Sequence, residues 1–377
     1  MKCLRRRLCR CLNLINKNLG IYVHFPFCKS KCKYCDFNSS DKNWCLEDKY
    51  IDALVKEIDN CTFKDKADTI FFGGGTPTAV KISNLIKVID AVKKKFDISN
   101  CEFTVECNPA TIEYDGFVKL KQAGINRISM GLQSANDDEL KFLGRIHTFD
   151  MFLKTYEDAR KAGFENINVD LMFSLHRQTL DKWLYTLNKV TELKPQHISC
   201  YSLIVEEGTP FYNMELDLPD EETDRKMYYS AVDLLKSRGY GHYEISNFAL
   251  DGYECRHNIK YWERANYLGF GCGASGMYDN VRYQNTYDVA EYIEKNVVSE
   301  EFLSLEDIMA EHIFLGLRMI NGFDIEKFKS MYNVDFRKKY KEQIRKFTDL
   351  GLLEISENCR LTREGLSVSN SVMCEFV

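Results

Sequence analysis

Hydrophobic and polar positions repeat along residues 20–204 as short apolar runs followed by polar or glycine-containing loops and amphipathic stretches. The apolar runs predict strands, and the stretches with apolar residues 3.6 positions apart predict helices. The predicted strands are Gly20–Phe25, Thr69–Gly73, Glu102–Glu106, Arg127–Leu132, Asn166–Met172 and His197–Ile204, and the predicted helices include Lys49–Asn60, Ile82–Phe96, Asp115–Ala123 and Thr148–Ala162. Alternating strands and helices are typical of parallel strands joined by right-handed crossovers, so we expect an α/β fold with a partial (β/α)6 barrel.

The pattern changes after about residue 215. Residues 217–238 read as a loop and a helix, residues 243–248 as a further strand, and the chain beyond residue 303 is helix-rich with a hairpin near residues 351–363. We therefore divide the chain into a basic tail (1–18), a barrel (19–215), a barrel-completing region (216–298) and a helix-rich, winged-helix-like domain (299–377). The charges of this last domain are mixed, which favours a structural or protein-contact role over binding to DNA.

Composition narrows the class of protein. The chain has 377 residues, of which 45% are hydrophobic, so it can bury a sizeable core. A net charge of −5 argues against nucleic acid as the main partner. The chain has no run of about twenty apolar residues, so we expect no membrane span. The first eighteen residues are basic, and we interpret them as a solvated tail, with a transit peptide as the alternative.

Three cysteines carry the strongest chemical signal. Cys28, Cys32 and Cys35 follow a C-x3-C-x2-C spacing. Three thiolates can hold three irons of a cubane iron–sulfur cluster and leave the fourth iron open to a small molecule. Structural zinc instead prefers four ligands, often in two separated pairs. The other cysteines, among 15 in the chain, are scattered, which indicates a reduced, cytosolic protein.

Further polar and glycine residues end the predicted strands, where parallel barrels place their active sites. Gly73-Gly74-Gly75-Thr76-Pro77 ends the second strand, Glu106 the third and Gln133 the fourth, while Asp170 lies late in the fifth. Glycines let the backbone approach a ligand closely, and the run lacks the sequence of a phosphate-binding loop. Arg145, in the loop after the fourth strand, is suited to bidentate contact with a carboxylate.

The cysteine spacing, with Tyr34 before the third cysteine, resembles the cluster loop of radical S-adenosylmethionine (SAM) enzymes. This resemblance implies a [4Fe–4S] cluster whose open iron is chelated by SAM, with reductive cleavage of the sulfonium as the chemistry. The cofactor supplies that reactivity, and the protein supplies placement and exclusion of water.

The order of motifs resembles the oxygen-independent coproporphyrinogen oxidases and their relatives, the HemW-type heme chaperones, from about Gly20 to the C-terminus. The matching pieces include Tyr22-Val-His-Phe-Pro-Phe-Cys28, Gly73-Gly-Gly-Thr-Pro-Thr78, Glu106-Cys-Asn-Pro109, Ser129-Met-Gly-Leu-Gln-Ser134, Leu143-Gly-Arg-Ile-His147 and Asn168-Val-Asp-Leu-Met172. By this resemblance the SAM site is lined by Tyr22, Tyr34, Gly74, Gly75, Thr76, Glu106, Gln133, Arg145 and Asp170.

Two features favour the chaperones over the oxidases. The oxidases resemble one another in a further cysteine two residues after the third, where this chain has Phe37, and in a longer segment before the cluster loop. The stretch His257-Asn258-Ile-Lys-Tyr261-Trp262 matches the H-N-x-x-Y-W motif that the resemblance associates with heme binding. Imidazole is a common iron ligand and aromatic faces suit a macrocycle, although a histidine beside aromatics is often an ordinary core residue. Cys255 and Cys272 flank the motif as alternative ligands.

One loop departs from the family pattern. After the fifth strand the family commonly has Gly-Leu-Pro-Gly-Gln-Thr, whereas this chain has Ser174-Leu-His-Arg-Gln-Thr179. His176 and Arg177 thus replace residues that shape the loop. The contact with the SAM adenosine is the part of the resemblance that this departure affects.

We therefore expect a cytoplasmic heme chaperone that binds heme, a [4Fe–4S] cluster and SAM and hands heme to an acceptor protein. Its expected partners are that acceptor and a reductant such as flavodoxin or ferredoxin, with no enzymatic turnover required. The alternative is an oxygen-independent coproporphyrinogen III oxidase, which would decarboxylate its substrate by radical chemistry. A radical SAM enzyme with another substrate is the third hypothesis.

Overall fold

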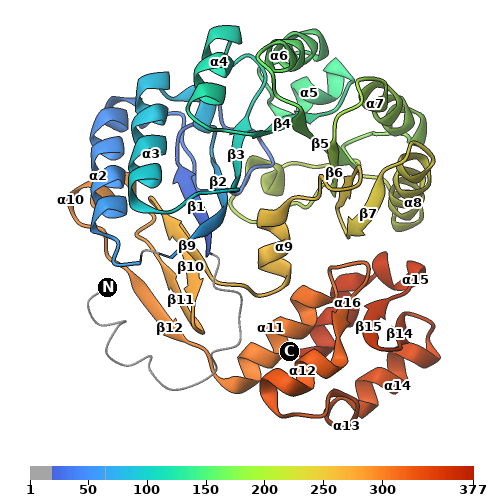
Figure 1. The fold of residues 1–377 in the computed structure, drawn as a ribbon. Coiled ribbons are helices and arrows are strands. Elements are labelled where there is room, and N and C mark those ends of the chain that lie inside the picture. The colour runs from blue at the N-terminus through green and yellow to red at the C-terminus, as the bar shows by residue number, and fades with distance from the viewer. Residues whose placement is uncertain (1–18, 64) are drawn as a thin grey trace.

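A single twelve-stranded sheet organises most of the molecule in the computed structural model, which describes residues 19–63 and 65–377 (Figure 1). Its strand order is β12-β11-β10-β9-β1-β2-β3-β4-β5-β6-β8-β7. The first six strands pair in chain order and all in parallel, as the alternating pattern predicts. They are β1 (Leu19–Phe25), β2 (Ala67–Gly74), β3 (Glu102–Cys107), β4 (Arg127–Gln133), β5 (Asn166–Phe173) and β6 (His197–Ser202). The predicted basic tail lies outside the described residues.

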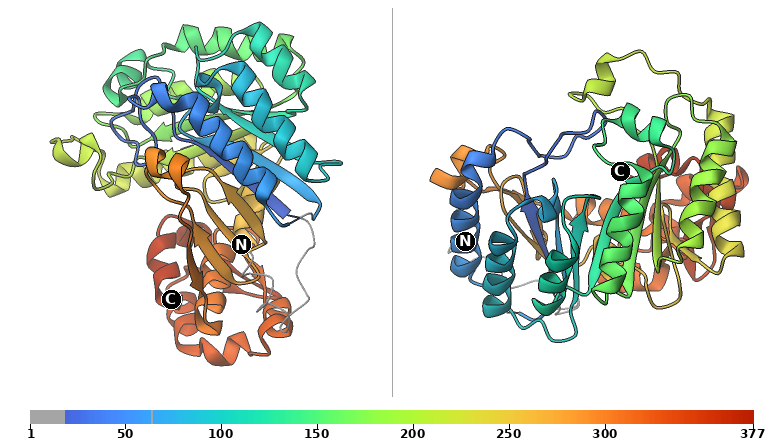
Figure 2. Two further views of the ribbon diagram at one scale, coloured as in Figure 1. Left: turned by 90° about the vertical axis from the view of Figure 1, so that its left-hand side faces the viewer. Right: turned by 90° about the horizontal axis from the view of Figure 1, so that it is seen from above.

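Helices between these strands cover the outer face of the curved sheet (Figure 2, right). Each helix buries one apolar stripe; in α2, Tyr50, Ile51, Leu54 and Ile58 are buried while Asp52, Lys56 and Asp59 are exposed. The helices are α2 (Glu47–Asn60), α3 (Ile82–Lys95), α4 (Tyr114–Gln122), α5 (Asp137–Leu143), α6 (Phe149–Lys161), α7 (Leu180–Glu192) and α8 (Glu221–Ser237). The predicted partial barrel is thus confirmed, with its hydrophobic core between helices and sheet.

Two groups of strands extend the sheet beyond the parallel part. β7 (Gly241–Glu244) and β8 (Asn247–Ala249) replace the single strand predicted at residues 243–248, because the backbone turns between them. At that turn Ile245 N–H donates to Arg318 O (3.0 Å) and Cys200 N–H to Ser246 O (2.8 Å), so neighbouring segments complete its hydrogen bonds.

On the opposite edge β9 (Tyr267–Phe270) pairs in parallel with β1, which the hydrophobic pattern did not predict. It is followed by β10 (Ser275–Tyr278), β11 (Val281–Gln284), helix α10 (Val289–Glu294) and β12 (Ser299–Phe302). Helix α9 (Arg256–Trp262) precedes β9 and carries the H-N-x-x-Y-W motif. This edge therefore brings a segment from late in the chain beside the first strand.

A helix-rich domain with its own hydrophobic core forms the C-terminal part. Its elements are α11 (Leu305–Gly316), β13 (Phe323–Asp324), α12 (Ile325–Tyr332), α13 (Phe336–Lys339), α14 (Lys341–Asp349), β14 (Leu353–Ile355), β15 (Asn358–Leu361), α15 (Arg363–Leu366) and α16 (Ser369–Met373). The antiparallel pair β14–β15 is the predicted hairpin, and β13 completes a three-stranded sheet. The proposed boundary at residue 299 coincides with the start of β12, which still pairs with β11 of the large sheet.

An ion network joins the two parts. Glu311 of α11 accepts a hydrogen bond from Arg264 Nε (2.7 Å) and pairs with Arg282 of β11. Arg318, just after α11, lies with its guanidinium 4.3 Å from the ring centre of Trp262 and forms an ion pair with the buried Glu244 (3.6 Å). The C-terminal domain is therefore held directly against helix α9.

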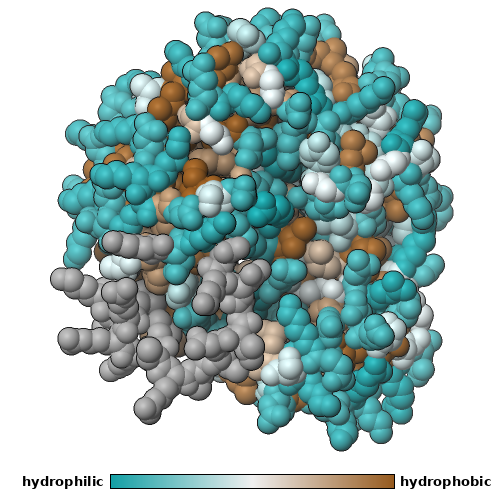
Figure 3. Space-filling view, in the orientation of Figure 1, coloured by the Kyte–Doolittle hydropathy of each residue, from teal (hydrophilic) through white to brown (hydrophobic). Residues whose placement is uncertain are grey.

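The surface in the view of Figure 1 is mainly hydrophilic, with hydrophobic residues scattered between polar ones (Figure 3). Across residues 19–63 and 65–377, no helix is long and apolar enough to cross a membrane.

Candidate functional site

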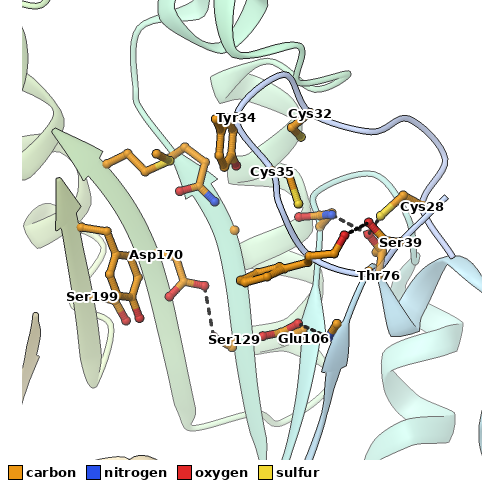
Figure 4. Close-up of a pocket in the computed structure, with 18 of the residues that line it drawn as sticks. Cys28, Cys32, Tyr34, Cys35, Ser39, Thr76, Glu106, Ser129, Asp170 and Ser199 are labelled. Carbon is orange, nitrogen blue, oxygen red and sulfur yellow. Dashed lines mark hydrogen bonds between the residues drawn. The ribbon is translucent and has the colours of Figure 1, made fainter. Parts of the chain in front are cut away.

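A cavity of about 440 Å³ opens where the carboxyl ends of β1–β6 converge (Figure 4). A volume of this size is within the usual range for small-molecule sites. Parallel strands place the residues that follow them at one edge, which brings together motifs lying more than 100 positions apart. The polar and sulfur-containing side chains that line the cavity include Cys28, Cys32, Cys35, Tyr34, Thr76, Glu106, Asn108, Arg127, Ser129, Gln133, Arg145, Asn168, Asp170, Ser199 and Asn258.

The glycine run at the end of β2 positions the cysteine loop, which we define as residues 26–40. Gly75 N–H donates to Phe25 O (2.8 Å) and Thr76 N–H to Phe27 O (2.7 Å), so the two segments cross in direct backbone contact. A Cβ at Gly75 would lie 2.6 Å from Phe27 O, and one at Gly74, whose φ is +106°, would lie 2.4 Å from the ring of His24. Only glycine permits this approach, so the run builds the loop as well as the ligand site.

The three cysteines of the loop line the same cavity, and in Figure 4 they lie across it from Asp170. Cys28 Sγ contacts Thr76 Oγ1 (3.6 Å), and Arg145 Nη1 donates to Cys32 Sγ (3.6 Å). Burial raises the pKa of the Cys35 thiol to about 11, and burial also raises that of Cys28, so both thiols are neutral without a metal. Coordination to iron would remove these protons.

The spacing of the donors distinguishes a cluster from a single ion. Among the residues that the structure describes, no group of three or more His, Cys, Asp or Glu side chains is close enough to hold one metal ion. A cubane cluster offers a separate iron to each thiolate, so its ligands lie farther apart than the ligands of a single metal ion. Three cysteines around one cavity, with polar donors beside two of the sulfurs, therefore fit a cluster better than a lone zinc ion.

Arg145 is held in place beside the cysteines by the end of β4. Its Nη2 donates to Asn108 Oδ1 (2.6 Å) and to the carbonyl oxygen of Gly131, while Asn108 Nδ2 donates to Thr76 Oγ1 (2.6 Å). Arg145 Nε is buried without a hydrogen-bond partner in the described part of the chain. Arg145 lines the cavity, and a guanidinium fixed by its neighbours is suited to bind an anionic group such as a carboxylate.

Two partly buried carboxyl groups, Glu106 and Asp170, lie on the wall of the cavity. Glu106 accepts a hydrogen bond from Gly74 N–H (3.1 Å), and burial, assisted by the nearby Asp170, raises the pKa of Glu106 to about 8. Asp170 accepts hydrogen bonds from Ser129 Oγ (3.2 Å) and Asn168 Nδ2 (2.8 Å), and burial also raises its pKa. Carboxyl groups with perturbed pKa values are typical of ligand sites, where they bind hydroxyl or ammonium groups.

The cavity contains all but one of the residues that the sequence assigns to the SAM site. The exception is Tyr22, which does not line it; its hydroxyl instead contacts His24 Nδ1 (3.0 Å), and His24 Nε2 donates to Asn38 O (2.7 Å). Tyr22 therefore supports the cysteine loop from behind.

Several polar residues of the wall were not singled out from the sequence. Asn108 and Asn168 belong to motifs that the sequence does show, so their position within those motifs was the available signal. Arg127 and Ser199 begin or continue strands, and Arg127 is 1% exposed. These two side chains line the cavity because of the register between adjacent strands, which the sequence alone does not show.

The H-N-x-x-Y-W motif is divided between the cavity wall and the interior. Asn258 lines the cavity, whereas His257 is 1% exposed and stacks on Phe71, itself a wall residue, at 5.4 Å between ring centres. His257 Nδ1 contacts Thr69 Oγ1 (2.9 Å) and Nε2 contacts Tyr261 Oη (2.8 Å). Because both ring nitrogens are engaged, iron could bind His257 only after one of these hydrogen bonds is given up.

The family departure at residues 174–179 has a clear backbone signature. Ser174 (φ 56°) and Arg177 (φ 53°) both adopt the left-handed conformation, at the two positions where the resembling family has glycine. Glycine adopts this conformation readily and other residues only at a cost, so both positions have a backbone conformation that suits glycine.

Comparisons with known proteins agree with this geometry. Residues 22–190 match the radical SAM superfamily and residues 303–368 match the HemN C-terminal domain. Heme chaperone HemW of Lactococcus lactis is 37% identical over 97% of this chain and 98% of its own length, and that of Bacillus subtilis is 36% identical over 94% and 98%. The structure of coproporphyrinogen III oxidase (HemN) from Escherichia coli superimposes with a TM-score of 0.85 at 23% identity, covering 96% of this chain and 90% of that one. The chain therefore belongs to the HemW family within the radical SAM superfamily.

Proposed function

We propose that this protein is a heme chaperone, which binds heme and transfers it to an acceptor protein. The observation that carries the proposal is the similarity to proteins named heme chaperone HemW over almost the whole chain, at 37% identity to that of Lactococcus lactis. The match covers helix α9 and the C-terminal domain as well as the radical SAM region. The proposal therefore rests on the entire architecture and not on the cysteine loop alone.

We assign the cofactors to the cavity at the strand ends. Cys28, Cys32 and Cys35 would hold a [4Fe–4S] cluster, and SAM would occupy the remaining space beside Tyr34, Gly74, Gly75, Thr76, Glu106, Gln133, Arg145 and Asp170. Arg145 is suited to the carboxylate of SAM, and the carboxyl groups of Glu106 and Asp170 to its hydroxyl and amino groups. When bound, the reduced cluster supplies an electron for cleavage of the SAM sulfonium.

Heme would bind next to this site, at helix α9. Asn258 lines the cavity, and His257 lies directly behind the cavity residue Phe71. For His257 to bind iron through Nε2, the hydrogen bond between Nε2 and the hydroxyl of Tyr261 must break. The hydroxyl of Tyr261 would then be free to form another hydrogen bond, and its aromatic ring is suited to contact a macrocycle. The neutral form of His257 needed for metal binding is favoured because burial lowers its pKa to about 3.

The second candidate function is oxidative decarboxylation of coproporphyrinogen III. The structure of HemN, a coproporphyrinogen III oxidase, is similar to this one, but at 23% identity the similarity supports the fold alone. Phe37 lines the mouth of the cavity and is 59% exposed, where the oxidases of the sequence resemblance carry a further cysteine. Because this chain lacks that cysteine, the residue at position 37 favours the chaperone.

The partners follow from this assignment. A chaperone needs an acceptor for its heme, and a cluster that reacts with SAM needs a one-electron donor such as flavodoxin or ferredoxin. A reducing compartment would keep the cysteines available for iron, so we place the protein in the cytoplasm.

The test is a heme titration of the anaerobically reconstituted protein, with His257→Ala beside the wild type. We expect stoichiometric binding with a Soret band that the variant loses or shifts. His312→Ala is the matched control, because His312 is also buried and contacts a tyrosine (Tyr332, 3.0 Å), but lies in the C-terminal domain. Wild type that binds no heme, yet decarboxylates coproporphyrinogen III with dithionite and SAM, would favour the oxidase instead.

A further inference from the structure

A small hydrophobic cluster, separate from the two main cores, lies beside the cavity. It contains Leu143, Met172, Leu175, Leu203 and Phe211, and Tyr34 and Phe142 pack against it. These residues come from the cysteine loop, from the end of helix α5, from β5 and the loop after it (residues 174–179), and from the segment after β6, residues 203–219, which we call the β6 loop. The β6 loop arches over the end of the barrel at which the cysteine loop lies (Figure 2, right).

We infer that His176, Arg177 and Asp217 form a clasp that fastens the β6 loop onto the cysteine loop and thereby positions Cys32 and Tyr34. Asp217 makes three contacts with the loop after β5: its N–H donates to His176 Nδ1 (2.9 Å), its carbonyl oxygen accepts from Arg177 N–H (2.8 Å), and its carboxylate accepts from Arg177 Nε (3.2 Å). The three residues thus tie two loops together through both backbone and side chains.

The clasp continues to the cysteine loop through Phe142. The ring of His176 stacks on the ring of Phe142, with 4.3 Å between centres and 9° between planes. Lys33 Nζ lies 5.4 Å from the centre of the Phe142 ring. Phe142 also packs against Phe211 of the β6 loop (5.3 Å). Backbone bonds complete the connection, since Phe211 N–H donates to Lys33 O (3.1 Å) and Lys33 N–H to Leu143 O (3.0 Å). Lys33 stands between Cys32 and Tyr34, so this chain of contacts ends at the cluster ligands.

The conformation of the loop after β5, residues 174–179, supports a role for these side chains. Ser174 and Arg177 both have positive φ, which costs free energy for any residue with a Cβ. Ser174 Oγ donates to Asp224 of α8, which also accepts from Ser202 Oγ at the end of β6 (2.8 Å). The left-handed conformation at both positions is therefore coupled to contacts with β6 and its loop. A glycine at residue 177 would keep the loop shape but not the ion pair.

The inference concerns the order of the metal-free protein, so it is tested independently of heme binding. Hydrogen exchange followed by mass spectrometry would compare peptides covering residues 26–40 and 203–219 in wild type and in His176→Ala/Asp217→Asn. Loss of one stacking contact and its hydrogen bonds should speed exchange in both peptides about tenfold. A second readout is the loss of cluster absorbance to an iron chelator after reconstitution, which should also accelerate.

Three variants separate a clasp from general destabilisation. Glu354→Gln removes an exposed carboxylate that pairs with Arg360 (2.9 Å) in the β14–β15 hairpin of the C-terminal domain, and it should leave both peptides unchanged. Arg177→Lys should retain most of the protection and Arg177→Gly should lose part of it. Exchange within twofold of wild type in both peptides of the double variant would overturn the inference, whether or not the protein binds heme. Faster exchange in residues 203–219 alone would overturn its extension to the cysteine loop.

Discussion

Replacing Glu106 with glutamine should change how the stability of the metal-free protein depends on pH. Glu106 is enclosed at the end of β3, and its pKa rises from 4.5 to about 8, first because burial penalises the carboxylate and then because Asp170 is close. The folded protein therefore holds a proton on Glu106 over a pH range in which the unfolded chain has lost it. Glutamine resembles the protonated acid, keeps an oxygen to accept from Gly74 N–H, and does not titrate.

The magnitude follows from the two pKa values. The folded state binds more protons than the unfolded chain between pH 4.5 and about 8, so stability falls as the pH rises through this window and levels off above it. Between pH 6 and pH 9 the wild type should lose about 2.5 kcal/mol of unfolding free energy relative to Glu106→Gln. The repulsion from Asp170 is already contained in the raised pKa of Glu106, so it adds no further difference.

Urea unfolding of both proteins at pH 6 and pH 9, with reductant present and circular dichroism as the signal, measures this difference. Other groups that titrate, including the cysteines, are common to both proteins and cancel. A wild-type-to-variant difference that stays within about 0.5 kcal/mol across this range would refute the reasoning. It would mean that the positive charge of Arg127 stabilises the carboxylate of Glu106 as well as water does.

The remaining predictions concern the cluster ligands, the glycine crossing and the domain contact. Cys35→Ala should lower iron bound after reconstitution from about four per chain to below one, measured by iron assay and visible absorbance. Gly75→Ala should also abolish cluster binding, because its Cβ would lie 2.6 Å from a backbone oxygen of the cysteine loop, whereas Gly241→Ala, with 3.6 Å to its nearest neighbour, should bind iron normally. Glu311→Ala should cost about 3–5 kcal/mol in urea unfolding, because Arg264, with a side chain only 3% exposed, loses its carboxylate partner; a cost below about 1 kcal/mol would show that Asn280 and water compensate.

Local patterns were sufficient for the parallel part of the fold. Each of the six strands is a short apolar run bounded by a polar or glycine residue, and amphipathic helices lie between them, so period and order determine the topology. The cysteine spacing and the glycine run are also local, because a cluster loop and a tight backbone crossing are each made by residues adjacent in sequence. The pairing of β9 with β1 was not predictable in this way, because the two strands lie far apart in the chain. The division of residues 241–249 into two strands was not predictable either, because distant segments complete the hydrogen bonds of the turn between them.

The amino-acid sequence by itself determined which residues end the strands, and hence most of the cavity wall. Only the tertiary structure decided where the side chains point: Tyr22 supports the loop from behind, and His257 is enclosed between Thr69 and Tyr261 while its neighbour Asn258 reaches the cavity. The same holds for His176 and Arg177, whose partner Asp217 is about forty residues away. A motif specifies chemical groups along one segment, whereas burial and hydrogen bonding depend on the segments that fold against it.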